Sequence, residues 1–328
     1  MRINKKLVKD RRRVRPVINT KPVINTKPVI NTKPVINTEL IINTDNFSLI
    51  EIKNSSIFNE KDIQIIIFSK NRACQLDLFL RTYKKYWIEK PNNVHVIYAF
   101  SEQKYLDGYE KLIERNREIH FVKQSVFIKD LLSVIDSNIE NIIFFTDDDV
   151  FIDYFSVKTN EFKNFVDNND NILCLSLRLG KNINYSYALN MQSLIPNDIQ
   201  NNIFNWSTAM ADWGYPMSVD GHLFRTFDIM NIICNSNASN PNELESYLCS
   251  NIIRNKQFMI CFDNSRIFNI PLNKVSDSNK NRSQNIDLLF LNDMFLDNKV
   301  ISLNCVEKCK YPNSVHFELD KIEMVEYY

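Results

Sequence analysis

The chain has 328 residues, of which 44% are hydrophobic and 24% are charged, the ordinary balance of a folded globular protein. The formal net charge of +1 gives no overall attraction to nucleic acid, so nucleic acid is not an expected partner. The four glycines, at positions 108, 180, 214 and 221, are scattered along the chain. A P-loop or a dinucleotide fingerprint needs several glycines within a few residues, so both kinds of nucleotide site are excluded.

Residues 1–45 are predicted to form a basic, disordered arm, followed by a linker over 46–61. The segment 15–44 consists of the hexapeptides RPVINT, KPVINT in three copies, and ELIINT. The proline in each of the first four copies prevents a continuous helix. Each of those copies has only Val and Ile as apolar residues, which are too few to build a core.

The sequence also bears on location and on metal binding by cysteine. The basic start MRINKKLVKDRRRVR is not followed by the apolar region of a secretory signal, and no apolar run reaches the roughly 18 residues of a membrane span. We therefore expect a cytoplasmic protein with no transmembrane segment, whose basic terminus allows peripheral contact with the inner face of a membrane. The seven cysteines are expected to be reduced and structural. Cys305 and Cys309 with His316 lack a fourth ligand, which disfavours zinc.

The next part of the chain alternates strands with helices. Periodicity predicts a strand over 63–69, a helix over 71–86, a strand over 94–100, a helix over 105–116, a strand over 119–123, a helix over 127–137 and a strand over 142–148. This order indicates an α/β domain over 62–328 with a mainly parallel sheet flanked by helices. Ligands of such sheets bind at the carboxyl ends of the strands, where the loop 69–72 and three consecutive aspartates are expected.

The pattern is less regular after residue 153. A strand is expected over 172–180 and a helix over 241–253, with an aromatic-rich segment between them at 204–216. We interpret this half as an irregular elaboration on the sheet and not as a separate domain.

The stretch FFTDDDVFID places Asp147, Asp148 and Asp149 directly after a buried strand. Carboxylates suit Mg²⁺ or Mn²⁺, which are usually held by one or two carboxylates together with substrate phosphates. In an extended chain Asp147 and Asp149 project to the same side and Asp148 to the other. This predicts Asp149, with Asp147, as metal ligands, and the roles exchange if the chain turns there. The alternative is a solvated turn or a helix cap.

The segments IIIFSKNRACQLDLFLRTY, FIKDLLSVI and IIFFTDDDVFID resemble the nucleotide-sugar-binding half of a GT-A-fold (Rossmann-like), family-2-like glycosyltransferase. The resemblance covers roughly residues 62–260, and the DDD resembles the DxD motif of that fold. It implies a nucleotide-diphospho-sugar donor, with UDP-sugar favoured, bound through Mn²⁺ or Mg²⁺. It also implies a glycan acceptor on the side of the irregular elaboration.

Several residues are expected to bind the donor, and the resemblance implies this role for Ser69, Lys70, Asn71 and Arg72. Trp213 and Asp220 are candidates for contact with the acceptor or the donor sugar, because sugar sites use aromatic faces and carboxylates. The expected nucleotide-sugar contacts are Ser69, Lys70, Asn71, Arg72, Lys129, Asp147, Asp148 and Trp213. Asp148 would reach a ribose hydroxyl and Lys129 the diphosphate. The alternatives are a solvated loop for 69–72, an ordinary exposed helix lysine for Lys129 and an aromatic core for Trp213. His316 is a further candidate metal ligand, together with Asp149 and Asp147.

An inverting transfer needs a carboxylate to take the proton of the acceptor hydroxyl. The segment NPNELESYL resembles the acidic helix start at which inverting members place this base. Glu243 is the first candidate, Glu245 the second and Asp220 the third. Favourable placement of glutamates at a helix N-terminus explains the same pattern, and a retaining enzyme would need no such base.

The function expected from the sequence is that of a metal-dependent glycosyltransferase (EC 2.4), which acts in cell-surface polysaccharide or lipopolysaccharide synthesis. One alternative is a sugar nucleotidyltransferase, although its first loop is glycine-rich and SKNRACQ has no glycine. Another is a non-catalytic nucleotide-sugar-binding protein that displays the repeats.

Overall fold

The computed structural model describes residues 60–168, 170–274 and 282–327. The predicted arm over 1–45 and residues 46–59 of the predicted linker lie outside the described residues. A short 3-10 helix, η1 (Glu60–Asp62), leads directly into the first strand.

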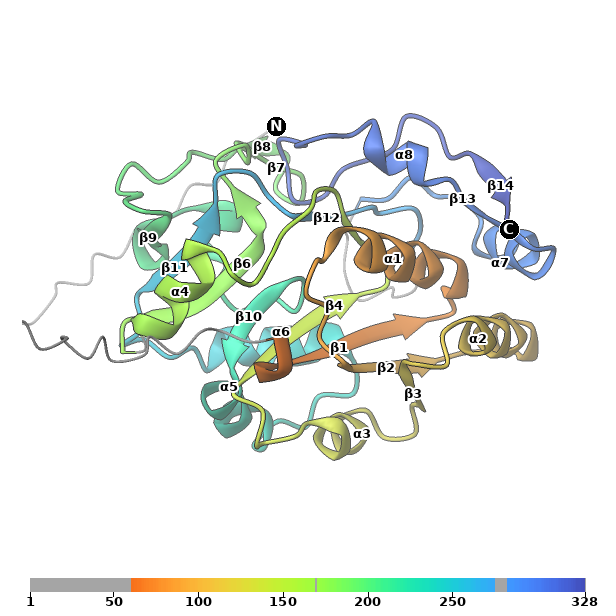
Figure 1. Ribbon diagram of the computed structural model, residues 1–328, viewed down its shortest axis with the longest axis horizontal. Coiled ribbons are helices and arrows are strands. Elements are labelled where there is room, and N and C mark those ends of the chain that lie inside the picture. The colour runs from red at the N-terminus through yellow and green to blue at the C-terminus, as the bar shows by residue number, and fades with distance from the viewer. Residues whose placement is uncertain (1–59, 169, 275–281, 328) are drawn as a thin grey trace, which may run out of the picture. The chain divides into compact units, whose positions relative to one another are not determined.

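A sheet of eight strands forms the centre of the domain (Figure 1). Its order is β3 (His120–Lys123), β2 (Asn93–Ala99), β1 (Ile63–Lys70), β4 (Asn141–Thr146), β10 (His222–Arg225), β6 (Ile172–Gly180), β11 (Phe258–Phe262) and β9 (Ile203–Asn205). The strands β3, β2, β1 and β4 are parallel, and β6 and β11 are parallel to each other. β10 is antiparallel to both β4 and β6, and β9 to β11. The predicted mainly parallel α/β sheet is confirmed.

Both faces of the sheet are covered by helices, as Figure 1 shows. The helices are α1 (Ala73–Tyr86), α2 (Gln103–Arg115), α3 (Phe127–Val134), α4 (Asn160–Asp167), α5 (Thr226–Ile233), α6 (Pro241–Ser250), α7 (Leu288–Leu296) and α8 (Leu303–Glu307). In β1, Ile65 and Ile67 pack into the core with α1, α2 and α7, whereas Ile66 and Phe68 pack into the core with α3, α5 and α6. A strand that is buried on both faces has a continuous apolar sequence, which is why IQIIIF could be predicted to form a strand.

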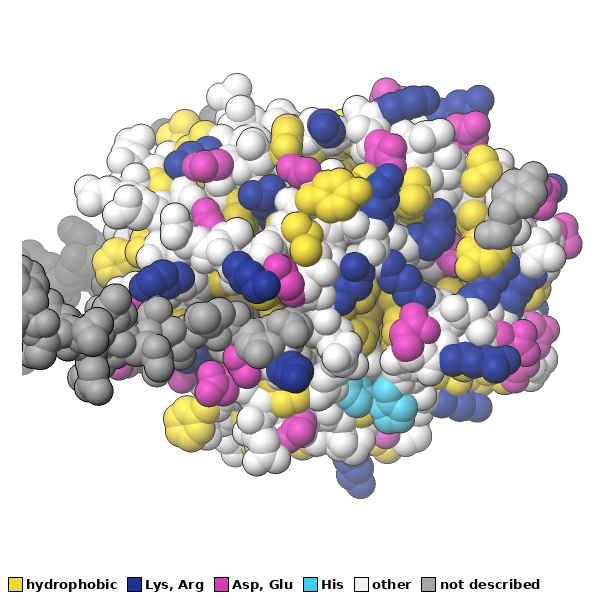
Figure 2. All heavy atoms as spheres, in the orientation of Figure 1, with side chains coloured by type: hydrophobic (Ala, Val, Ile, Leu, Met, Phe, Trp, Pro, Cys, Tyr) yellow, Lys and Arg dark blue, Asp and Glu magenta, His cyan; other side chains and the backbone are white. Residues whose placement is uncertain are grey.

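Three two-stranded ribbons complete the domain. They pair β5 (Asp149–Phe151) with β12 (Ile267–Asn269), β7 (Tyr185–Ser186) with β8 (Met191–Gln192), and β13 (Lys299–Ile301) with β14 (Met324–Glu326). Two 3-10 helices, η2 (Trp206–Thr208) and η3 (Ala211–Gly214), occupy the aromatic-rich segment. Within the described ranges, no helix is long and apolar enough to cross a bilayer. Basic and acidic side chains are interspersed over the face in Figure 2, in keeping with the small net charge.

The strand predicted over 142–148 is wrong at its end. β4 ends at Thr146, the chain turns at 147–148, and Asp149 begins β5. The backbone N–H of Thr146 donates a hydrogen bond of 2.9 Å to Oδ2 of Asp149, which holds the turn closed. The side chains of the three aspartates therefore do not alternate between two sides, as they would in an extended chain. Each aspartate has different neighbours.

Candidate functional site

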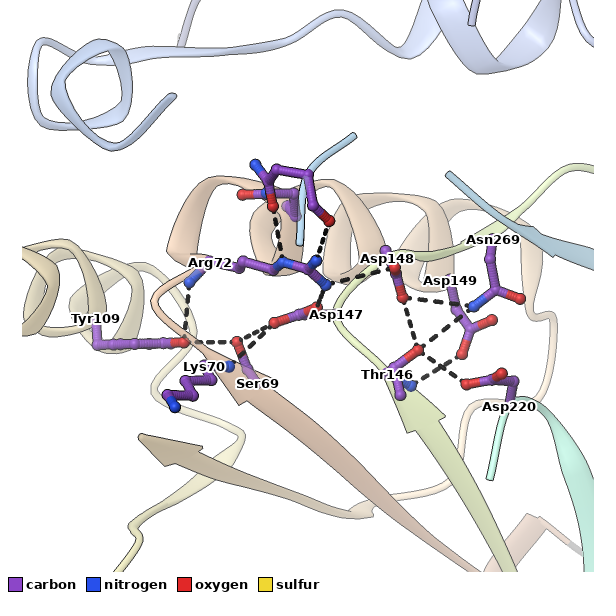
Figure 3. A network of polar contacts seen from close by, with 12 residues as sticks. Ser69, Lys70, Arg72, Tyr109, Thr146, Asp147, Asp148, Asp149, Asp220 and Asn269 are labelled. Carbon is purple, nitrogen blue, oxygen red and sulfur yellow. Dashed lines mark hydrogen bonds and ion pairs between the residues drawn. The ribbon is translucent and has the colours of Figure 1, made fainter. Parts of the chain in front are cut away.

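Polar side chains meet where β1 and β4 end, around the guanidinium of Arg72 (Figure 3). Nη1 of Arg72 lies 2.9 Å from Oδ1 of Asp147 and 3.4 Å from Oδ2 of Asp148. Its Nε donates to Oδ1 of Asn273 at 2.9 Å, and its Nη2 donates to the carbonyl of the same residue. The Arg72 side chain is buried with all three nitrogens engaged, so it positions the aspartates and is not free to contact a nucleotide.

Asp147 is the most enclosed partner of this arginine. Its Oδ2 accepts hydrogen bonds from the hydroxyl of Ser69 at 2.7 Å and from the backbone N–H of Lys70 at 3.2 Å. The Ser69 hydroxyl also lies 2.6 Å from the hydroxyl of Tyr109. Burial raises the pKa of Asp147 to about 6, although Arg72 acts in the opposite direction. Both carboxylate oxygens are thus used within the protein.

Asp148 and Asp149 lie on the other side of the turn, next to Asp220 (Figure 3). The Thr146 hydroxyl lies 2.7 Å from Oδ1 of Asp148 and 2.9 Å from Oδ1 of Asp220, and its one proton serves one of them at a time. The amide of Asn269 reaches Asp148 at 3.4 Å. Asp149 is fully buried, and burial together with Asp220 and Asp148 raises its pKa well above the ordinary value. Close carboxylates of this kind favour a cation between them.

A second buried arginine, Arg178 on β6, faces the same carboxylates. Its Nη1 lies 2.5 Å from Oγ of Ser218 and 3.1 Å from Oδ2 of Asp220. Burial lowers the pKa of Arg178, but the surrounding carboxylates raise it overall, and these are Asp220, Asp212, Asp149 and Glu245. Sequence reasoning missed this residue. The available signal was a charged side chain inside the otherwise buried strand ILCLSLRLG.

The two candidate glutamates of α6 have different surroundings. Oε1 of Glu245 accepts hydrogen bonds from the Ser218 hydroxyl at 3.0 Å and the backbone N–H of Val219 at 3.1 Å. Burial, and next the charge of Asp220, raise the pKa of Glu245. Glu243 is exposed, and hydrogen bonds from Ser239 to its carboxylate lower its pKa. The structure brings Glu245 and Asp220 together and leaves Glu243 as part of the helix cap.

Trp213 is buried in the core and does not lie in the site, so the predicted contact of its ring with a sugar is wrong. The side chain is fully buried, its Nε1 donates to the carbonyl of Ile183 at 3.1 Å, and its ring packs edge-on against Phe204. An indole with its only donor satisfied inside the core is a packing residue.

Three other predicted residues are placed as follows. Asn71 has a positive φ of 60° and exchanges hydrogen bonds with Ser101, which ties the loop after β1 to the end of β2. The Lys70 side chain is exposed at the mouth of this loop. Lys129 is exposed in the first turn of α3, outside the network of Figure 3.

His316 lies beside the carboxylates, as predicted for a metal ligand. Burial and Arg178 lower its pKa, whereas the facing Asp220, Asp148 and Asp212 raise it. Its ring stacks on Tyr187 with centroids 5.9 Å apart. The thiol of Cys309, in contrast, donates to the carbonyl of Cys305 within one local turn.

The donor set fits a divalent cation. Several buried side-chain atoms make no hydrogen bond within the described residues, and four of them belong to residues of this cluster, namely Oδ1 of Asp149, Oδ2 of Asp212, Oδ1 of Asn269 and Nδ1 of His316. Carboxylate and amide oxygens are the ligands that Mg²⁺ and Mn²⁺ prefer. In the described part of the chain, no three His, Cys, Asp or Glu side chains already converge as a metal site. The residues therefore fit a cation that completes its coordination with substrate phosphates.

The chain is similar to a curated protein, the bifunctional glycosyltransferase pgtA of Dictyostelium discoideum. It is 28% identical to that protein over 285 residues, which cover 75% of this chain and 36% of that protein. The chain thus spans little more than a third of the relative it matches. The predicted resemblance to a glycosyltransferase is confirmed by this relative. No protein-family model matches the chain.

Two solved structures are also similar. One is a cytidylyltransferase from Leptospira borgpetersenii, with a TM-score of 0.37, 15% identity, and 72% of this chain and 94% of that chain covered. The other is the mannosyltransferase PcManGT from Pyrobaculum calidifontis in complex with GDP-Man and Mn²⁺, with a TM-score of 0.35, 8% identity, and 61% and 54% covered.

Proposed function

We propose that this chain is a metal-dependent glycosyltransferase that moves a sugar from a nucleotide-diphospho-sugar to a hydroxyl of a glycan. The observation that carries the proposal is Asp149, a buried carboxylate with one unpartnered oxygen, which sits beside Asp148 and Asp220 at the carboxyl end of β4. The similarity to a glycosyltransferase supports the same activity. The reaction would belong to the EC 2.4 class.

On the donor side, Asp149 and Asp148 would hold Mn²⁺ or Mg²⁺, and the donor phosphates would complete its coordination, because the described residues bring no third His, Cys, Asp or Glu ligand into place. A cation held there would supply positive charge that stabilises the leaving diphosphate. Arg72 and Ser69 hold the side chain of Asp147 in place. This contact stabilises the turn at 147–148 and so positions Asp148. Lys70 would contact the donor phosphates from the mouth of the loop, and UDP-sugar is the donor we favour.

On the acceptor side, Glu245 is the base we propose. Burial raises the pKa of Glu245, which makes its carboxylate a stronger base, and the carboxylate is joined to Asp220 through Ser218 and Arg178. The oxygen of the acceptor hydroxyl bonds to the anomeric carbon, and its proton passes to the Glu245 carboxylate. The bond from the anomeric carbon to the phosphate oxygen breaks, and the nucleoside diphosphate leaves. This is an inverting displacement.

The physiological acceptor we propose is a glycan in cell-surface polysaccharide or lipopolysaccharide synthesis, built from the cytoplasmic side of a membrane. A sugar nucleotidyltransferase would instead join a nucleoside triphosphate to a sugar phosphate and release pyrophosphate. The two activities are therefore separated by their products.

The test is hydrolysis of UDP- and GDP-sugars by the purified chain, with and without Mn²⁺ and in parallel with a pyrophosphate-release assay. We expect nucleoside diphosphate release that depends on Mn²⁺ and is lost in Asp149→Asn. Asp153→Asn is the matched control, because Asp153 pairs with Arg266 outside the cluster, and this variant should keep the activity. Unchanged turnover in Asp149→Asn would exclude the metal role of this residue, and pyrophosphate release would exclude the transferase.

A further inference from the structure

The loop over 209–216 is held firmly on both sides of one exposed aromatic residue, Tyr215. Before it, Trp213 is fully buried and donates to Ile183. After it, the carbonyl of Pro216 lies 3.1 Å from Nδ1 of His222 and 3.4 Å from the thiol of Cys174, both buried. Tyr215 itself is 40% exposed. The backbone around Tyr215 is thus fixed, while part of the residue stays open to solvent.

Two positions in this loop, Gly214 and Ala211, have a backbone that is sterically restricted. A Cβ at Gly214 would lie 2.6 Å from the backbone carbonyl oxygen of Ala209, and Ala211 has a positive φ of 52°. The loop therefore presents Tyr215 on a backbone that is restrained before any ligand arrives, which lowers the entropic cost of binding.

This surface borders the carboxylate that we propose as the base. The segment that follows Tyr215 wraps around Glu245, because Ser218 and Val219 both donate to its Oε1. The Tyr215 hydroxyl faces the same carboxylate, and burial and Glu245 together raise the pKa of Tyr215. A ligand placed against the exposed part of Tyr215 would have Glu245 within its immediate surroundings.

We infer that Tyr215 is the platform on which the acceptor sugar stacks. An acceptor in the proposed reaction is a pyranose with an apolar C–H face and a rim of hydroxyls. Aromatic side chains in ligand sites supply apolar area, while a few placed polar groups fix the orientation. Tyr215 provides the apolar area, and Glu245 provides the polar group that fixes the orientation. The inference rests on the proposed function, since it takes Glu245 as the acceptor's base.

The inference is tested by saturation-transfer NMR with methyl glycosides of glucose, galactose, mannose and N-acetylglucosamine, in the presence of UDP and Mn²⁺. We expect ring protons of at least one glycoside to receive magnetisation from the protein. Tyr215→Ala should weaken binding of that glycoside by about tenfold or more, and Tyr215→Phe, which keeps the ring, should retain it. Tyr154→Ala is the matched control, because Tyr154 is an exposed tyrosine that packs on Tyr86 outside the site.

Two results would overturn the platform: no contact of any glycoside with the unaltered protein, or equal contact in Tyr215→Ala. Circular dichroism and thermal unfolding of each variant separate loss of the platform from loss of the fold, with Tyr215→Phe as the variant least disturbed. Failure of the proposed function appears in a different measurement, as absent Mn²⁺-dependent donor hydrolysis by the unaltered protein. The two failures are therefore distinguishable.

Discussion

Arg72 and Asp147, which are 75 positions apart in the sequence, form a buried ion pair with 2.9 Å between Nη1 and Oδ1. The pair joins the loop after β1 to the turn after β4, the two chain segments that we propose as the donor side of the site. Removing one partner would leave the other charge buried and uncompensated, which costs about 3 to 5 kcal/mol. The pair thus ties the geometry of the site to the stability of the domain.

The first prediction concerns this pair. Arg72→Met and Asp147→Asn should each lower the free energy of unfolding by about 3 kcal/mol, because each leaves a buried partner unpaired. In the double variant, the loss of free energy of unfolding should be smaller than the sum of the two single losses, because neither buried charge remains. Urea unfolding of the four proteins measures the difference. Additive losses would mean that the two side chains stabilise the fold independently.

The second prediction concerns pH and stability. The pKa of Asp147 is about 6 in the folded protein and about 4 for an unfolded aspartate. Between these values the folded protein holds a proton that the unfolded chain has lost, so the free energy of unfolding should fall as pH rises through this window. In Asp147→Asn that contribution should disappear. Urea unfolding from about pH 4 to about pH 7 tests this, and parallel curves for the two proteins would contradict it.

The third prediction separates the two glutamates of α6. Glu245→Gln should lower the transfer rate by about 10²- to 10⁴-fold, because the amide cannot accept the acceptor's proton. Glu243→Gln is the matched change two residues earlier, and it should retain most of the activity, since Glu243 is exposed and serves the helix cap. Steady-state rates with saturating donor make the comparison. Equal rates for Glu245→Gln and the unaltered protein would remove Glu245 as the base.

The fourth prediction concerns the order in which cation and nucleotide bind. Few ligating side chains converge in the described residues, so Mn²⁺ alone should bind weakly and UDP should strengthen its binding by contributing phosphate oxygens. Titration of Mn²⁺ by electron paramagnetic resonance, with and without UDP, measures the change. Tight binding without nucleotide would show that the protein supplies a complete ligand set by itself.

The buried strands could be predicted from the sequence because both their faces are covered. The run ILCLSLRLG was expected over 172–180 and forms β6 over the same residues. The end of β4 could not be predicted in this way, since the side chain of Asp149 takes the backbone N–H of Thr146 and turns the chain. Local hydrophobicity carries no information about such a side-chain bond.

The site was predictable only in part. The three aspartates and Arg72 follow strand ends, where topology alone places them together, and His316 was singled out as well. Asn273 was not, because its contact with Arg72 joins residues 201 positions apart. The choice between Glu243 and Glu245 and the burial of Trp213 both depend on which way a side chain points once the loop 209–220 is folded. Composition and spacing do not specify that direction.

Arg178 has a consequence for handling the protein in the laboratory. In structural zinc proteins the cation is the main compensating charge, and a chelator unfolds them. Here the guanidinium of Arg178 already faces Asp149, Asp212, Asp220 and Glu245, while Arg72 neutralises the other side of the turn. We therefore expect EDTA to remove bound ions without unfolding the domain, so that the protein can afterwards be dialysed against a chosen cation.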